Sequence, residues 1–522
     1  MNYPVWYIPM VGGPLIIAFV AIVHVLVSHF AVGGGLWLVL TEKKAYGESS
    51  GKRELILDYV RKHTKFFMLL TLVFGSITGV GIWFSIALIN PDATSFLIHT
   101  FVFGWAIEWV FFVIEIVTAF LYFYTFEKVS EKTHMLIGWI YFLAAWASLF
   151  IINAIISFML TPGKWQATQS FWDGVFNPTF WPSLVFRTFL CFALAGSYAL
   201  LTATIKFTGE AKENLVRYNG KWILYSLLGM IPAMVWYYFS LPEQAKQGLS
   251  GASYIMKVSL VHLIAGVVFF LVLSLLWAVW KARRLSFTGA VGILLTIFVF
   301  FGAFEFIREA GRKPFIINNY MYATGLTVEQ HEALKGQSFL RDAKWAQTKE
   351  ITSNNELKAG EELFRLQCYA CHSLGLKNNV NSKIALRDLP QLSRIMGGLR
   401  GITPYMLGFT GTETEKNALA KWLYSITHEG LPEPGPPSAP APGTVVPAVQ
   451  GETVFKNFCA DCHEISEGDS IMRRLGETKG VEEITELLGK LDQLSEDMPP
   501  FEGTEAEKKA LADYLDGLRS KK

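Results

Sequence analysis

The stretch FTGAVGILLTIFVFFGAFEFIREAGRKPF, residues 287–315, decides the fold class of this protein. Its first part, Phe287 to Phe306, is almost entirely apolar and has the length of about 20 residues that a helix needs to cross a bilayer. The stretch then ends on a carboxylate, Glu309, and on the polar run GRKP. An ionisable group at the end of such a helix is a candidate functional residue, because it is costly to place there.

Seven more segments have the same apolar character, and together with residues 287–309 they predict eight membrane spans. They are residues 15–40, 66–89, 98–126, 135–160, 181–205, 222–240 and 255–280. Residues 340–522 instead read as a soluble sequence rich in Lys, Glu and Gly. The predicted fold is therefore all-α, a polytopic helix bundle followed by a soluble half. The net charge of +2 gives no indication of nucleic-acid binding.

Lys and Arg are distributed unequally between the two sides of the bundle. The connections after the first, third, fifth and seventh spans hold Lys43, Lys44, Lys52, Arg53, Arg61, Lys62, Lys65, Lys128, Lys132, Lys206, Lys212, Arg217, Lys221, Lys281, Arg283 and Arg284. The alternate connections hold Lys164 and Lys246. Because basic short loops stay in the cytoplasm, the N-terminus is expected outside. The start MNYPVWYIPM has no basic region typical of a cleaved signal peptide.

Four of the five cysteines form two C-x-x-C-H motifs, which are typical of covalent c-type haem attachment. The motifs are Cys368-Tyr369-Ala370-Cys371-His372 and Cys459-Ala460-Asp461-Cys462-His463. In each, the thiols add to the haem vinyl groups and the histidine is placed to bind the iron. The remaining cysteine, Cys191, lies within the fifth span and is expected to be a buried, inert thiol.

An internal repeat surrounds the two motifs. GEELFRLQC, residues 360–368, matches GETVFKNFC, residues 451–459, and MLGFTGTE, residues 406–413, matches MPPFEGTE, residues 498–505. Each unit thus predicts a helix, a haem loop, a methionine loop and a helix. Met406 and Met498 are candidate second axial ligands, with Met396 as an alternative in the first unit. The other interpretation is that these methionines fill the core.

Each unit resembles class I cytochrome c over roughly 75 residues. The predicted organisation is a membrane domain at residues 1–320, a connector at 321–350, cytochrome c domains at 351–428 and 448–522, and a linker at 429–447. The linker is rich in proline, which favours an extended and semi-rigid spacer. Haem attachment takes place outside the cytoplasm, in agreement with the orientation of the spans. Both domains are expected in the periplasm of a bacterium, with the spans in its inner membrane.

Few ionisable residues lie within the spans, and each is a functional candidate. They are His24, His29, Glu108, Glu115, Arg187, Lys257, His262, Glu305, Arg308 and Glu309, with His99 at the outer end of the third span. An imidazole at His24 fits a haem ligand or a hydrogen bond to a neighbouring helix. Glu108 and Glu115 lie seven residues apart on one helix face. They fit a proton route or a pair satisfied by interhelical hydrogen bonds.

Residues 10–320 resemble the large subunit of cytochrome bd-type oxygen reductases. The resemblance rests on the span with His24, on Ala-Ile-Glu at residues 106–108 followed by a second glutamate, on Asn177-Pro178, and on Glu-x-Gly-Arg-x-Pro-aromatic at residues 309–315. It implies that His24 is the axial ligand of the oxygen-binding haem, of type d or b, and that Glu309 ligates a high-spin haem b. It also implies that Glu108 and Glu115 line a proton path, that Arg312 lies near the haem pair, and that a second membrane subunit is a partner.

The chain departs from this family pattern at the electron-input side. The family's low-spin haem b uses a histidine on the fifth span and a methionine on the seventh, where this chain has Arg187 and His262. That haem is therefore lost or ligated by His262 with His29 or His99, and Arg187 pairs with a haem propionate in one alternative. The two glutamates stand one residue closer than usual. The connection at residues 241–253 is too short for the family's quinol-binding loop, and the two cytochrome c units replace a ninth span.

The resulting hypothesis is an oxidase whose electrons come from a periplasmic cytochrome c or similar donor. They pass through two covalent haems c to membrane haems of type b or d, which reduce oxygen to water. One alternative is a membrane electron-transfer subunit that exchanges electrons between quinone or a partner complex and periplasmic cytochromes. Another is a different small oxidant, such as nitric oxide.

Overall fold

The computed structural model describes residues 5–376, 378–385, 387–403, 405–428, 451–459, 478, 480–491, 501 and 503–519. The chain divides into two compact units, Pro14–Leu326, and Met1–Gly13 together with Thr327–Lys522. The first is the membrane unit and the second the soluble unit. Apart from one pair of short strands in the membrane unit, the regular structure of the described residues is helical, which confirms the predicted all-α class.

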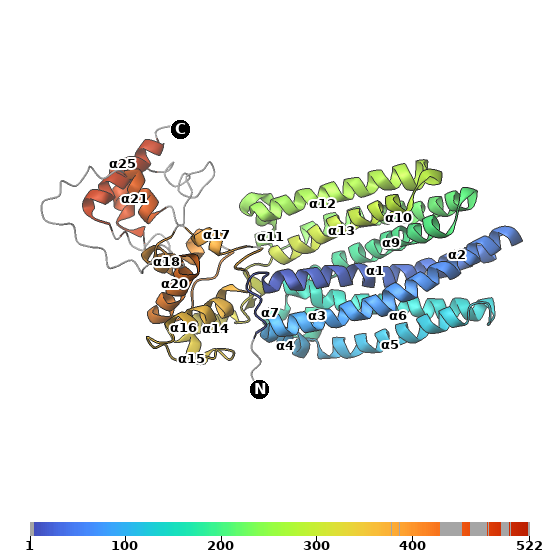
Figure 1. Ribbon diagram of the computed structural model, residues 1–522, viewed down its shortest axis with the longest axis horizontal. Helices are drawn as coiled ribbons and strands as arrows, with labels where there is room; N and C mark the ends of the chain where they lie inside the picture. The colour runs from blue at the N-terminus through green and yellow to red at the C-terminus, as the bar shows by residue number, and fades with distance from the viewer. Residues whose placement is uncertain are drawn as a thin grey trace. The chain divides into compact units, whose positions relative to one another are not determined.

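The membrane unit contains eight helical segments that are long and apolar enough to cross a membrane, as predicted. They lie side by side along one direction in Figure 1. Their elements are α1 (Gly13–Tyr46), α2 (Ser50–Met68) continued by η1 (Leu69–Phe74) and α3 (Gly75–Ile89), α5 (Val102–Tyr124), α6 (Glu131–Leu160), α9 (Phe180–Lys206), α10 (Gly209–Phe239), α12 (Tyr254–Leu273) continued by η3 (Ser274–Trp280), and α13 (Phe287–Ala310).

Short elements connect or follow these helices. They are α4 (Pro91–Thr100), α7 (Trp165–Thr168), α8 (Phe171–Val175), α11 (Glu243–Gln247), η2 (Gly248–Ala252), η4 (Ala282–Arg284), β1 (Phe315–Ile317) and β2 (Met321–Tyr322). The two strands pair antiparallel directly after α13. The turn between them is tied to the end of α6, because Asn318 N donates to Met159 O over 2.9 Å.

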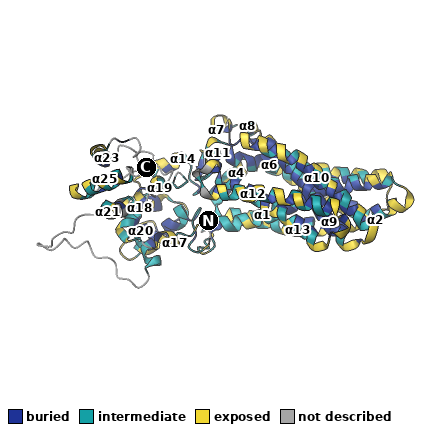
Figure 2. Ribbon diagram, turned by 90° about the horizontal axis from the view of Figure 1, so that it is seen from above, coloured by how far each residue is buried: buried dark blue, intermediate teal, exposed yellow. Residues whose placement is uncertain are grey.

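Helix α9 is the centre of the membrane unit and packs against α2, α6, α10 and α13. Small residues on its neighbours let backbones approach closely, as is usual between membrane helices. A side chain at Gly33 of α1 would lie 1.9 Å from the carbonyl oxygen of Cys191, so only glycine fits there. Cys191 is fully buried, as expected. Buried residues accordingly gather around α9 and α10 in Figure 2.

The soluble unit contains α14 (Val328–Ala333), α15 (Phe339–Asp342), α16 (Glu356–Leu363), η5 (Phe364–Cys368), α17 (Asn381–Ile384), α18 (Leu389–Gly397), α19 (Leu399–Ile402), α20 (Glu413–Thr427), α21 (Gly451–Phe458), α23 (Val481–Leu488) and α25 (Glu505–Arg519). Its helices form two similar pairs, α16 with α20 and α21 with α25. A Cβ at Gly360 would lie 2.2 Å from Ala418 O, and one at Gly451 would lie 2.0 Å from Ala510 O. The repeat seen in the sequence is therefore also a repeat in helix packing.

Residues 327–350, expected as a connector, pack onto the first cytochrome c region. The Glu415 carboxylate of α20 accepts hydrogen bonds from Phe339 N at 3.0 Å and Leu340 N at 2.8 Å. Glu362 of α16 accepts one from Thr348 N at 2.7 Å. These carboxylates satisfy backbone donors that are otherwise buried without a partner. The segment therefore belongs to the soluble unit.

The N-terminal residues 5–12 also belong to the soluble unit and form what we call the strap. Leu374 N donates to Pro9 O over 2.7 Å, and Leu376 N donates to Met10 O over 2.8 Å. Ile8 N donates to the Tyr369 hydroxyl over 2.9 Å. The strap thus lies along the loop that follows Cys371 and His372.

Candidate haem and proton sites

Glu309 ends α13 within a group of cations. Arg312, which is buried, donates to a Glu309 carboxylate oxygen, and Lys313 Nζ lies 3.2 Å from the other. Arg312 also donates to Ile316 O over 2.5 Å, which folds the chain back after the helix. A carboxylate can therefore end this membrane helix because fixed positive charges compensate it.

The short connection between α10 and α12 covers this segment. Gln244 Nε2 donates to Lys313 O over 2.6 Å, and a Cβ at Gly311 would lie 3.0 Å from Ala245 Cβ. The connection Leu241–Ser253 consists of α11 and η2 with little else. It packs on the GRKP run at residues 311–314.

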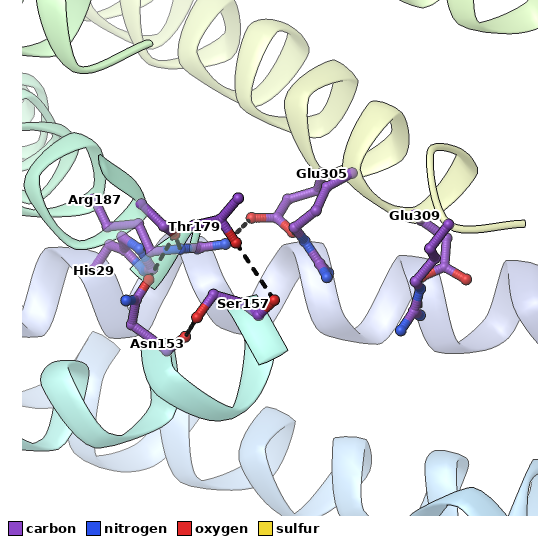
Figure 3. A network of polar contacts seen from close by, with 10 residues as sticks. His29, Asn153, Ser157, Thr179, Arg187, Glu305 and Glu309 are labelled. Atoms are coloured by element: carbon purple, nitrogen blue, oxygen red, sulfur yellow. Dashed lines mark hydrogen bonds and ion pairs between the residues drawn. The ribbon is translucent and has the colours of Figure 1, made fainter. Parts of the chain in front are cut away.

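A second charge network lies deeper in the bundle and joins α9 to α13 (Figure 3). Arg187 is fully buried and donates from Nη2 to Glu305 Oε1 over 2.5 Å. Arg308 Nε donates to the other oxygen of Glu305 over 2.9 Å. Arg187 also contacts His29 Nε2 at 3.4 Å and donates to Ser183 Oγ over 3.3 Å. Glu305 therefore pairs with the fully buried Arg187 and with the half-buried Arg308, and sequence reasoning did not identify this pairing.

The three histidines proposed for a re-ligated haem have different surroundings. His29 is buried, and its Nδ1 lies 2.8 Å from Val25 O while Nε2 faces Arg187. His99 and His262 are exposed, and each places Nδ1 near the carbonyl four residues earlier, Ser95 O at 2.7 Å and Val258 O at 2.8 Å. Both ring nitrogens of His29 are thus engaged within the protein, whereas no described contact joins His262 to His29 or His99.

Asn177, part of the predicted motif before the fifth span, fixes the start of α9. Its Nδ2 donates to Ser157 Oγ over 2.9 Å and to Gly174 O over 3.0 Å. Ser183 on the first turns of α9 donates to Asn153 Oδ1 of α6 over 2.6 Å. These bonds hold α6 and α9 together beside Arg187, so Asn177 has a structural role here.

His24 lies in the interior of the first span and points toward α3. Its Nδ1 lies 3.1 Å from both Gly75 O and Thr78 Oγ1, and a Cβ at Gly79 would lie 3.0 Å from its Cε1. Glycine at residue 79 thus leaves room for the ring. Within the described residues, Nε2 has no hydrogen-bond partner. A histidine held through Nδ1 with Nε2 free has the donor chemistry of an axial haem ligand.

His24 and Glu309 are not in contact in the described structure. Helix α1 meets α13 through other residues: the tilted rings of His29 and Phe301 have centroids 5.6 Å apart, and Ile22 approaches Gly302. The two predicted haem ligands therefore belong to different helices, α1 and α13, and do not touch each other. The imidazole nitrogen of His24 is a common haem ligand, whereas both carboxylate oxygens of Glu309 are paired with Arg312 and Lys313.

Glu108 and Glu115 lie on one face of α5 and share a neighbour on α6. Ser148 Oγ donates to Glu108 Oε1 over 3.0 Å and also interacts with Glu115. Glu115 Oε1 is buried and has no hydrogen-bond partner. The alternative interpretation is that interhelical hydrogen bonds satisfy both glutamates. It holds for Glu108, but Glu115 Oε1 has no hydrogen-bond partner.

The first C-x-x-C-H motif forms a compact loop at the end of η5. His372 N donates to Cys368 O over 2.9 Å, and His372 Nδ1 lies 3.2 Å from Asn378 O. That carbonyl selects the tautomer whose Nε2 is free to bind iron. Burial lowers the pKa of His372 to about 4, so its imidazole is neutral, as a metal ligand must be. Burial raises the pKa of Cys368 to about 12.

The residue directly before Cys368, Gln367, joins the haem loop to the methionine loop. Gln367 Nε2 donates to Thr410 O over 2.7 Å, and Thr410 N donates to Gln367 Oε1 over 3.0 Å. These two hydrogen bonds hold the loop that contains Cys368 against the loop that contains Met406. Met406 is half-buried and Met396 is buried in α18. In the second cytochrome c repeat, Cys459 is half-buried, whereas Cys462, His463 and Met498 lie outside the described residues.

His331 of α14 makes the soluble unit sensitive to acid. It is buried and lies 2.9 Å from Thr410 Oγ1, and burial lowers its pKa from 6.5 to about 4. Because the folded state takes up this proton less readily than the unfolded state, the stabilisation is complete above pH 6.5 and is lost as the pH falls toward 4. We expect the unfolding temperature of the full chain to fall between pH 6.5 and pH 4. We expect a smaller fall in the variant His331→Gln. Equal pH dependence in both proteins contradicts the assignment.

Comparisons with known proteins agree with this architecture. Residues 15–240 match the family model of cytochrome bd terminal oxidase subunit I, and residues 447–515 match that of cytochrome c oxidase, cbb3-type, subunit III. A solved structure of bd oxidase from Geobacillus thermodenitrificans has a similar fold. Its TM-score is 0.51 at 14% identity, and the match covers 59% of this chain and 88% of that one. No curated protein matches.

These two domain types imply haem as the cofactor and electron transfer as the activity. The bd-type match falls on the membrane unit, which contains His24, Glu108 and Glu115, and the cytochrome c match falls on the second C-x-x-C-H motif. The chain is therefore a multi-span membrane protein that joins a domain of the cytochrome bd terminal oxidase subunit I family to a cbb3-type cytochrome c domain.

Proposed function

We propose that this protein is a bd-like respiratory oxidase that takes electrons from a periplasmic cytochrome c or similar donor and reduces oxygen to water. The observation that carries the proposal is His24, an intramembrane histidine anchored through Nδ1 with Nε2 free. Bound haem, two of type c and others of type b or d, supplies the electron transfer and the oxygen-binding iron. The soluble domains lie in the periplasm in this proposal.

The residues of the chain have distinct tasks in the proposed reaction. Cys368, Cys371 and His372 hold the first haem c, with Met406 as second ligand, and Cys459, Cys462, His463 and Met498 do the same in the second unit. His24 and Glu309 hold the high-spin haems of the membrane unit. Arg312 holds the Glu309 carboxylate in place through an ion pair. Glu108 and Glu115 deliver protons to the oxygen site.

The network around Arg187 bears on the missing low-spin haem. Arg187 occupies the position where the resembling family has a histidine ligand, and it pairs with Glu305 instead. A buried, compensated ion pair fills this position with protein groups. This supports an enzyme in which electrons enter through the haem c units rather than through a quinol-oxidising haem.

Oxygen consumption with a reduced soluble cytochrome c is the direct test. We expect the purified protein, with its second membrane subunit, to consume oxygen and to shift a non-c haem band when carbon monoxide is added to the reduced form. Absence of both signals excludes the oxidase. That result would favour the second candidate, a membrane electron-transfer subunit between quinone and periplasmic cytochromes. This candidate is the weaker proposal because the connection Leu241–Ser253 is short for a quinol-binding loop.

Removing the first haem attachment site tests the electron-input part. The variant Cys368→Ala/Cys371→Ala loses one of the two covalent haems, because each haem needs its own thioether bonds. We expect weaker haem staining of the denatured chain and loss of cytochrome c oxidation. Cys191→Ala, which removes the buried thiol of α9, leaves staining unchanged. Full staining in the double variant contradicts the assignment.

A further inference from the structure

A buried polar cluster lies at the opposite end of the bundle from Glu309. Glu42 near the end of α1 is fully buried, and His134 on the first turns of α6 is 2% exposed. His134 Nδ1 lies 2.7 Å from Glu42 Oε1, and the Tyr122 hydroxyl of α5 donates to Glu42 Oε2 over 2.5 Å. His134 Nε2 lies 2.8 Å from Tyr122 O. Three helices thus converge on one carboxylate next to the basic connections.

Tyr46 gives the cluster a polar link to the surface. The hydroxyl of Tyr46, which is half-buried, donates to Glu42, and Arg53 of α2 lies over the Tyr46 ring at 5.1 Å. Arg53 in turn pairs with Glu131 at the exposed start of α6. Tyr46 therefore connects a solvent-exposed ion pair to the buried carboxylate.

The cluster also continues the stripe formed by the two glutamates of α5. Glu108, Glu115 and Tyr122 follow one another at intervals of seven residues, so all three lie on the same helix face. Successive members are separated by about 10 Å along the axis, since each residue adds about 1.5 Å. Tyr122, at the end of the stripe nearest the basic connections, is the member bonded to Glu42.

A small cavity lies between Tyr122 and the level of Glu115. Its volume is about 10 Å³, which is space for roughly one water molecule. Ala119, between the two residues on α5, lines it together with Thr64, Tyr122 and Tyr141, whose hydroxyls donate to Val60 O, Glu42 and Ala31 O, and with apolar residues. Tyr141 interacts electrostatically with Glu115, whose Oε1 is buried and has no partner. The gap in the stripe therefore has both room for water and an acceptor beyond it.

We propose that Glu42, held by His134, is the proton-collecting site that supplies Glu115 through Tyr122 and water in this cavity. The proposal rests on the proposed function, for which it names the entry of the proton path. A proton taken from solvent through Tyr46 protonates the Glu42 carboxylate. Protonated Glu42 gives its proton to the Tyr122 oxygen while the Tyr122 hydroxyl proton moves to the water, which protonates Glu115. Each relay group gains one proton as it loses one, so no charge is left behind.

The groups that face this site come from four helices. They are Glu42 and Tyr46 of α1, Arg53 and Thr64 of α2, Tyr122 of α5, and Glu131, His134 and Tyr141 of α6. A purely structural role would use the same contacts to hold α1, α5 and α6 together. The two roles differ in whether loss of the Glu42 proton site slows proton exchange at Glu115.

The test measures hydrogen–deuterium exchange of the Glu115 carboxyl group by infrared spectroscopy, using the full chain with its haems in liposomes. The band is assigned by its loss in Glu115→Gln. We expect exchange to be about a hundredfold slower in Glu42→Gln, because a positioned proton carrier typically accelerates transfer by about that factor. Tyr122→Phe, which removes only the hydroxyl oxygen, slows exchange as well and carries the test if Glu42→Gln does not fold.

His63→Gln is the matched control. His63 is a fully buried histidine of α2 bound to Thr202 Oγ1 at 2.8 Å, and it lines neither the cavity nor the stripe. We expect this variant to lose stability without slowing exchange. Exchange at the wild-type rate in Glu42→Gln and Tyr122→Phe, with intact haem spectra, overturns the proposal. The measurement needs no oxygen, so a protein that fails to reduce oxygen can still show the slowed exchange.

Discussion

The variant His24→Ala is expected to lose one high-spin haem signal and all oxygen consumption. The imidazole is held by Gly75 O and Thr78 Oγ1, so it has one fixed orientation, and its Nε2 is the free donor atom of this helix interior. Alanine offers no replacement ligand. Optical spectra of the reduced protein before and after carbon monoxide, together with haem extraction, measure the loss.

The matched control is His99→Ala, which removes an exposed histidine at the outer end of the third span. Its Nδ1 contacts only the carbonyl of Ser95 among the described residues, so both spectra and oxygen consumption stay unchanged. The covalent haems c also remain in His24→Ala, because their attachment depends on other residues. Unchanged high-spin signals in His24→Ala contradict the ligand assignment.

The variant Glu305→Gln is expected to cost about 3–5 kcal/mol of stability, the range measured when one partner of a buried ion pair is removed. Glu305 is the carboxylate for both Arg187 and Arg308. Without it, the fully buried Arg187 retains only neutral contacts to His29 and Ser183. The loss is measured as the change in the free energy of unfolding, with the protein unfolded by a chemical denaturant in detergent.

A compensating substitution separates charge from packing in this network. In Glu305→Gln combined with Arg187→Met, the fully buried charge is removed and only Arg308, which is partly exposed, lacks its carboxylate, so we expect part of the lost stability to return. Glu213→Gln breaks the half-exposed pair between Glu213 and Arg217 and is the control, with an effect within about 1 kcal/mol. If Glu305→Gln costs no more than Glu213→Gln, the buried network is not the stabilising feature described here.

The membrane spans and the haem motifs were predictable because their signals are local in the sequence. A run of about 20 apolar residues has few alternatives to a membrane helix. The C-x-x-C-H motif carries its chemistry within five residues, and the structure adds that Asn378 O orients His372. The repeat was also visible in the sequence. Both copies keep glycine at the same position, Gly360 and Gly451, because each makes the same close contact with a neighbouring helix.

Pairings between distant helices were not predictable in the same way. Glu305 and Arg187 each appeared in the sequence as isolated charges within spans, and only the packing of α9 on α13 shows that they neutralise each other. Glu42 was missed because it stands next to Lys43 and Lys44 and reads as a loop charge. Its burial follows from the length of α1, which extends to Tyr46 and carries the carboxylate into contact with α5 and α6.

The strap changes how the first cytochrome c unit is connected to the rest of the chain. Its residues run directly into α1, so this unit is joined to the membrane unit at both Gly13 and Leu326. Two covalent tethers restrict diffusion more than one, and a tethered partner acts at an effective concentration in the millimolar range or above. Electron exchange within the chain is therefore independent of protein concentration. Salt should slow only the bimolecular step with a charged external donor, because screening acts on that encounter.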